Sequence, residues 1–180
     1  MVRAFLALEL SGEIREGLKG AQDLLRTAGA RMTYVKPENI HITVKFLGEV
    51  DERLLLRVID AIRTLSFAPF EVSIGNVTVN NPRRPFTVWS TVSDGGRSAE
   101  LFSRVEEAFA PLGFAKETRP FTPHATLARI KAPPGPAFFT VLDSLKNRSY
   151  GSCKVTGIKL KKSSLTPGGP VYEDLLEVSW

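Results

Sequence analysis

The chain contains two histidines, and both stand in the same short pattern, His-Ile-Thr at 41–43 and His-Ala-Thr at 124–126. Around the first, apolar and polar residues alternate over positions 40–47, which is typical of a β-strand with one buried and one polar face. Residues i and i+2 of a strand point to the same face, so each histidine shares a face with its threonine. We therefore expect a fold that pairs the polar faces of two such strands.

Strand-like and helix-like segments alternate along the rest of the chain. Apolar residues at three- and four-residue steps predict helices after Ser11 and Asp51 and over 101–112 and 138–145. Strand formers predict extended segments at 2–10, 32–35, 70–79, 86–92, 121–130, 153–162 and 171–180. A doubly wound fold would need a helix at nearly every crossover, so we predict an α+β fold with largely antiparallel sheets.

Composition and charge narrow the class of protein. Among 180 residues, 24 are basic and 19 acidic, and the net charge of +5 favours an anionic partner such as RNA or a nucleotide. The single cysteine, Cys153, suits a reducing cytosol, and the apolar run at 2–10 is too short to span a membrane. The sequence contains no glycine-rich phosphate loop, so it does not predict a bound nucleotide triphosphate. We expect a single domain over 1–180, a cytoplasmic location and no membrane anchor.

The repeated pattern provides the groups that displacement at phosphorus requires. His41 and His124 supply a general base and a general acid, because an unperturbed pKa of about 6.5 lets one ring be neutral while the other is protonated. Thr43 and Thr126 add hydroxyl donors for an anionic oxygen. Either histidine alone would be read as a structural residue, but the repetition favours a catalytic pair. Two histidines 83 positions apart, with no carboxylate in either motif, make a poor metal site, so we expect no metal and no cofactor.

Longer stretches around both motifs match a known pattern. They are Arg-Ala-Phe-Leu-Ala-Leu at 3–8, the segments at 37–48 and 119–129, and the late pieces at 164–165 and 169–172. With them the chain resembles the two-histidine phosphoesterases, and among these the bacterial and archaeal RNA 2',3'-cyclic phosphodiesterases, also called 2'-5' RNA ligases. The resemblance implies a bilobal α+β fold. In it, two mostly antiparallel sheets flanked by helices are related by a pseudo-twofold axis, and both motifs face a central cleft.

The same resemblance implies an activity. An enzyme of this kind opens a terminal 2',3'-cyclic phosphate on RNA to a 2'-phosphate without metal, and 2'-5' ligation is the related reaction when an RNA 5'-hydroxyl replaces water. In the family pattern His124 activates the water, His41 protonates the departing ribose 3' oxygen, and Thr43 and Thr126 hold the nonbridging oxygens. The acid and base assignments can be exchanged, and the sequence leaves open whether hydrolysis or ligation is the cellular role.

Three further residues are candidates for substrate binding. Strict alternation places Phe46 with the core side chains of its strand, whereas the family likeness implies an aromatic that stacks on a base. Arg129 likewise lies an odd number of positions from His124, although the likeness implies that it reaches the phosphate or the base. Arg119 either clamps phosphate or is a solvated loop charge, and its place just before the second motif favours the clamp.

Other basic and aromatic residues are interpreted more conservatively. The turn residues Arg83 and Arg84 are expected to be solvated, with electrostatic steering of an RNA end as the alternative. The lysines at 159–162 share these two interpretations. Trp89 and Trp180 are expected to pack in the core or between the lobes rather than to stack on a substrate.

Two alternatives to the RNA phosphodiesterase remain open. One keeps the fold but changes the substrate to a small cyclic nucleotide or an ADP-ribose cyclic phosphate. The other is a non-catalytic RNA-binding module with structural histidines, against which the retention of both threonines argues. The predicted partner is an RNA end with a 2',3'-cyclic phosphate, and we expect a monomer.

Overall fold

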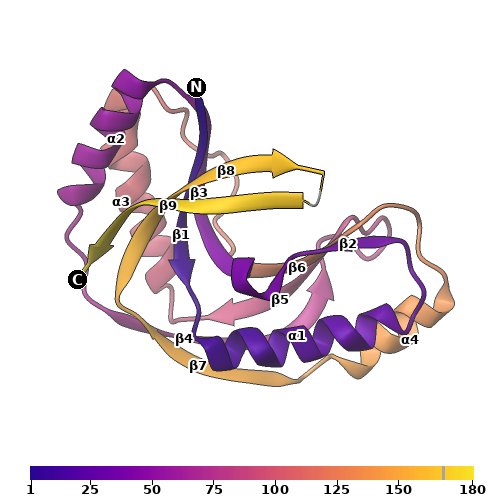
Figure 1. Ribbon diagram of the computed structural model, residues 1–180. Helices are drawn as coiled ribbons and strands as arrows, with labels where there is room; N and C mark the ends of the chain where they lie inside the picture. Colours follow the sequence, from indigo (N-terminus) through magenta and orange to yellow (C-terminus); the bar gives the residue numbers. More distant parts are fainter. Residues whose placement is uncertain (168) are drawn as a thin grey trace.

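The structure, a computed structural model, describes residues 1–167 and 169–180. Within them one antiparallel sheet of nine strands runs in the order β7-β4-β5-β6-β3-β1-β8-β9, and β2 pairs with β6 beside this path (Figure 1). The strands are β1 (Val2–Glu9), β2 (Met32–Tyr34), β3 (His41–Val50), β4 (Phe70–Val79), β5 (Thr87–Ser93), β6 (His124–Ile130), β7 (Ser149–Val155), β8 (Gly157–Thr166) and β9 (Gly169–Ser179).

Four α-helices cover one face of this sheet in two pairs (Figure 1). They are α1 (Gly12–Arg26), α2 (Glu52–Arg63), α3 (Arg97–Phe109) and α4 (Pro136–Ser144), with short 3-10 turns at Pro37–Asn39 and Ala110–Leu112. The helices expected after Ser11 and Asp51 are confirmed, and both residues are N-caps whose side chains accept hydrogen bonds from the backbone N–H groups of Ile14 and Leu54. None of the helices in the described ranges is long and apolar enough to cross a membrane.

The fold has two similar halves that meet between β3 and β6. Outward from this seam the strands run β3-β1-β8-β9 on one side and β6-β5-β4-β7 on the other. Helices α2 and α3 contact the first half, whereas α1 and α4 cover the second. The predicted α+β class and antiparallel pairing are confirmed. The two expected sheets are hydrogen-bonded into one, because Ile42 and Ala125 pair across the seam.

The sheet is strongly curled because of a one-residue connection. The extended segment expected at 153–162 is two strands, separated at Thr156. The first, β7, pairs with β4 at one edge of the sheet, and the second, β8, pairs with β1 near the other edge. A single residue cannot span a flat sheet of this width, so the edge strand must come round toward β8. Gly157 is required at this junction, since a Cβ there would lie 2.4 Å from the Val178 carbonyl oxygen.

Candidate active site

The two His-x-Thr motifs meet at the seam of the sheet. Ile42 and Ala125, the middle residues of the motifs, pair with each other and are fully buried against the helix-covered side. Their neighbours therefore point to the opposite side, here called the open face, which carries both histidines and both threonines. Because the strands are antiparallel, His41 lies opposite Thr126 across the seam, and Thr43 lies opposite His124.

Both imidazoles are held by the same hydrogen bond. Nδ1 of His41 lies 2.7 Å from the Asn39 carbonyl oxygen, and Nδ1 of His124 lies 2.8 Å from that of Thr122. A carbonyl oxygen can only accept a hydrogen bond, so each Nδ1 carries the ring proton and donates this hydrogen bond. In the neutral ring each Nε2 therefore keeps its lone pair. Nε2 of His41 is 3.0 Å from Oγ1 of Thr43. The Nε2 atoms are thus the reactive ones on the open face.

Aromatic rings support both histidines. Phe5 stacks on His41 with ring centroids 5.0 Å apart, and Tyr172 meets the same imidazole edge-on at 5.6 Å. On the other side of the seam the Trp89 ring lies 4.2 Å from that of His124. The prediction that Trp89 only packs in the core is therefore incomplete, because its ring lines the histidine. Nothing in the alternation of its strand distinguishes this role.

A β-bulge in β3 turns Phe46 to the open face. Ala7 pairs with Thr43, and Phe5 pairs with Phe46, a step of two residues along β1 but three along β3. The extra residue reverses the alternation, so the interpretation that places Phe46 with the core residues is wrong. Its side chain is 68% exposed, and its ring centroid is 6.0 Å from that of Phe5.

A second bulge, in β6, does the same for Arg129. Trp89 pairs with Thr126 and Thr87 with Arg129, again two residues on one strand against three on the other. Strict alternation would turn Arg129 away from His124, whereas the observed register puts both on the open face. Burial lowers the pKa of the His124 imidazole, and the charge of Arg129 lowers it further.

The remaining predicted residue, Arg119, is not brought to the four motif residues by any contact. It is exposed in the loop that precedes β6, and its side chain makes no hydrogen bond or ion pair within the described residues. Its place in the chain explains this, because it stands five residues before the strand and outside the register that aligns the others.

Burial keeps both imidazoles unprotonated in the unliganded protein. It lowers the pKa of His41 to about 4, with smaller contributions from the positive charges of Lys161 and Arg15. It also lowers the pKa of His124, with a contribution from Arg129. The expectation of one neutral and one protonated ring near pH 7 thus differs from the unliganded state. A bound phosphate anion would offset the nearby positive charges and raise both pKa values.

Positive charges converge on the open face beside Tyr172. Arg129, Arg3 and Lys161 all act to lower the pKa of its hydroxyl, although burial outweighs them and raises it. Lys161 is itself held at 2.7 Å from both Glu9 and Asp174. Sequence reasoning places Lys161 only among the basic residues in general, because the register that turns it inward depends on pairing with β1. Arg129 and Arg3 take part in no ion pair within the described residues, so these two cations suit an anionic ligand.

A buried ion pair fixes the other side of β3. Lys45, turned to the helices by the bulge, pairs with Glu106 of α3, and the two side chains are 9% and 8% exposed. Lys45 also donates to the Ala115 carbonyl oxygen at 3.1 Å, and Glu106 accepts from the Glu117 backbone N–H at 2.7 Å. The pair therefore ties the motif strand to the loop that leads to the second motif.

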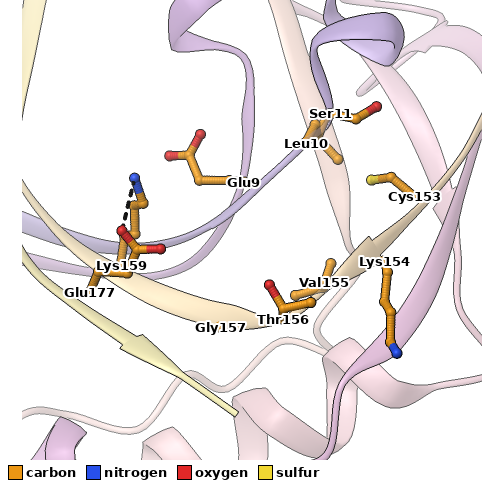
Figure 2. A pocket seen from close by; sticks show the side chains of 10 residues that line it. All are labelled: Glu9, Leu10, Ser11, Cys153, Lys154, Val155, Thr156, Gly157, Lys159 and Glu177. Carbon is orange, nitrogen blue, oxygen red and sulfur yellow. Dashed lines mark ion pairs between the residues drawn. The ribbon is translucent and has the colours of Figure 1, made fainter.

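A pocket of about 200 Å³ lies where β1 ends and β7 passes into β8 (Figure 2). Cys153, half-buried on β7, lines it together with charged side chains. No group of three or more potential metal ligands occurs among the residues that the structure describes. Charges in the pocket neutralise one another, as Lys159 pairs with Glu177 at 3.5 Å and with Asp174 at 2.6 Å. This pairing leaves the open face as the better site for an anionic ligand.

The comparison with protein families agrees with this two-part arrangement. The family model described as LigT like Phosphoesterase matches the chain twice, over residues 8–89 and 92–172, and each match contains one His-x-Thr motif.

Individual relatives match over nearly the whole chain. RNA 2',3'-cyclic phosphodiesterases of Methanothermobacter thermautotrophicus and Archaeoglobus fulgidus are 38% and 35% identical. The first match covers 97% of this chain and 96% of the relative, the second 97% and 98%.

Solved structures share the fold. The crystal structure of TT0787 of Thermus thermophilus superposes with a TM-score of 0.84 at 28% identity, covering 98% of this chain and 97% of that one. E. coli LigT complexed with 3'-AMP gives 0.79 at 24% identity, covering 99% and 97%. Two matches to one family model, full-length relatives above 30% identity and a common fold lead to one conclusion: the chain belongs to the LigT-like phosphoesterase family.

Proposed function

We propose that the chain is a metal-independent RNA 2',3'-cyclic phosphodiesterase. It adds water to the terminal cyclic phosphate, breaks the bond between phosphorus and the ribose 3' oxygen, and leaves a 2'-phosphate and a 3'-hydroxyl. The observation that carries this proposal is the placement of both His-x-Thr motifs on one face of two paired strands, with both Nδ1 atoms engaged by carbonyl oxygens. The names of the full-length relatives support the same substrate.

The two imidazoles divide the proton transfers between them. One Nε2 takes a proton from the attacking water, and the other gives a proton to the departing 3' oxygen. The family pattern makes His124 the base and His41 the acid. The pKa is lowered for both rings, so the two assignments stay exchangeable. Binding of the phosphate anion raises the fraction of protein with one ring protonated.

The other residues of the open face hold the substrate. The hydroxyls of Thr43 and Thr126 donate to the nonbridging oxygens as negative charge develops, and Arg129 adds a charged contact that the bound substrate and the transition state share. Phe46, exposed beside Phe5, offers a surface on which the terminal base stacks. Arg119 remains a predicted phosphate contact.

End-group analysis tests this function. An RNA with a 2',3'-cyclic phosphate is incubated with the protein in excess EDTA, and we expect a product with a 2'-phosphate. Restoration of a lost activity by zinc or manganese would contradict the metal-independent reaction. RNA retention without turnover would support the binding module, and preference for a cyclic mononucleotide over an oligonucleotide would support the small-substrate alternative. With a 5'-hydroxyl RNA present, 2'-5' ligation is expected as the related reaction. A cytoplasmic, monomeric enzyme remains our prediction.

A further inference from the structure

A second groove, of about 750 Å³, lies beyond the end of β6. Its walls are the turn between β4 and β5, the loop at 131–134 and the exposed edge of α4, and its main side chains are Arg83, Arg84, Phe86, Ile130, Lys131 and Phe139. The groove starts directly beyond Arg129, because Ile130 is the next residue and its N–H donates to the Phe86 carbonyl oxygen at 3.0 Å. It is therefore continuous with the strand that carries the second motif.

The charge of this groove is uncompensated. Arg83, Arg84 and Lys131 line it, and none of the three takes part in an ion pair within the described part of the chain. No aspartate or glutamate is among its lining residues. The pocket at the start of β8 differs, because two glutamates line it beside two lysines, and one of these lysines, Lys159, is already paired with carboxylates. A polyanion is the ligand that matches three unpaired cations in one groove.

Two exposed aromatic rings stand among these cations. Phe86 is 60% and Phe139 37% exposed, although phenylalanine is normally buried. The combination of cations with accessible aromatic faces is typical of surfaces that bind single-stranded nucleic acid, where bases stack and phosphates meet basic side chains.

The turn that carries the cations is held in one conformation by two asparagines. Oδ1 of Asn81 accepts from the backbone N–H groups of Arg83 and Arg84 at 2.9 and 3.3 Å. Oδ1 of Asn80 accepts a hydrogen bond from the backbone N–H of Phe86 at 3.0 Å. A binding surface preformed in this way loses less conformational entropy when a ligand binds.

We propose that this groove binds the RNA segment on the 5' side of the terminal cyclic phosphate. The proposal rests on the proposed function, which places that phosphate between the two motifs. From Thr126 to Ile130 the strand rises about 13 Å, so the groove receives nucleotides a few positions from the end, with Arg129 between the two regions. Bases stack on Phe86 and Phe139, and phosphates contact Arg83, Arg84 and Lys131. The groove thus gives the enzyme a preference for RNA over a cyclic mononucleotide.

The test compares two double variants of equal charge. Arg83→Ala/Arg84→Ala removes two groove cations, and Arg53→Ala/Arg57→Ala removes two exposed cations of α2, which lies at the other end of the molecule (Figure 1). Each is assayed on a 12-nucleotide RNA with a 2',3'-cyclic phosphate and on the cyclic mononucleotide. We expect the groove variant to lose about tenfold in kcat/KM on the oligonucleotide and nothing on the mononucleotide, and the α2 variant to match the unmodified protein on both.

Direct binding separates this proposal from the proposed function. Fluorescence anisotropy with a 3'-hydroxyl 12-mer needs no catalysis, and the groove variant should reduce the slope of log K against log salt by about 1.4, the value for two phosphate contacts on a single strand. Phe86→Ala should weaken binding about fivefold or more with the salt slope unchanged. Equal losses in the α2 variant, or equal losses on both substrates, would overturn the groove. Absence of hydrolysis with intact groove-dependent binding would overturn only the proposed function.

Discussion

The two halves of the open face are built alike but carry different side chains at one equivalent position. A bulge turns the fifth residue after each histidine to the open face. This residue is Phe46 in the first half and Arg129 in the second. The histidine of the first half is enclosed by Phe5 and Tyr172 and feels the charges of Lys161 and Arg15, whereas that of the second lies against Trp89 and feels the charge of Arg129. Pseudo-symmetry thus supplies a matched acid–base pair, and the two bulged positions distinguish the halves by an exposed aromatic ring at 46 and a cation at 129.

The largest effect should come from the residues that the halves share. Each of His41→Ala and His124→Ala is expected to reduce kcat by about 10²- to 10⁴-fold, because each removes one proton transfer from the same displacement. The double variant should be far less than multiplicatively worse. Rates are measured with saturating cyclic-phosphate RNA, and thermal melting of each variant establishes that the fold is intact. Multiplicative losses would show that the two rings act in separate steps.

The fourth residue after each histidine, which precedes the bulged position, also differs between the halves. Lys45 is paired with Glu106, whereas the equivalent residue of the second half is the buried Ala128. Lys45→Met should lower the free energy of unfolding by about 3–5 kcal/mol, because it leaves a buried carboxylate without its partner. Lys45→Met/Glu106→Gln should recover much of this loss.

Urea denaturation measures both variants of this pair. The control is Arg63→Ala, which breaks an exposed pair with Asp60 and should change stability by less than about 1 kcal/mol. An equal loss in the single and double variants would mean that Lys45 stabilises by packing alone.

The two bulged residues, Phe46 and Arg129, should affect RNA binding more than the chemical step. Arg129→Ala removes a charged contact and should raise KM about tenfold or more, with a smaller change in kcat. Phe46→Ala should raise KM for RNA by about fivefold or more through lost stacking, but should leave the salt dependence unchanged. Steady-state kinetics at two salt concentrations distinguish these effects. A fall in kcat alone for either variant would contradict its place on the binding side of the site.

The smallest expected effect is a displacement of the pH profile. The productive protein has one ring protonated and one neutral, and both pKa values lie below the ordinary 6.5, so kcat/KM should be bell-shaped with its maximum below that pH. Because bound phosphate raises both values, the profile of kcat should lie at higher pH. Arg129→Ala should move the profile of kcat/KM to higher pH, since it removes a charge that lowers the pKa of His124. A maximum of kcat/KM above pH 7 would exclude the lowered values.

The sequence predicts the antiparallel α+β fold and the pairing of the two motifs, since strand alternation and a repeated tripeptide are local patterns. It does not predict the faces of Phe46 and Arg129. A bulge adds one residue without a composition of its own, and it reverses every side chain that follows. The sequence also conceals the break at Thr156, because β7 and β8 are both rich in strand formers and differ only in their distant partners, β4 and β1.

The central claim, that the histidines are the acid and the base of one displacement, is tested most directly by a substrate with sulfur in place of the bridging 3' oxygen. A thiolate departs without a proton, so loss of the general acid should no longer matter. We predict that one of His41→Ala and His124→Ala recovers most of its rate on this cyclic-phosphate RNA, while the other remains at least about a hundredfold slow. Recovery of both variants, or of neither, would contradict the account.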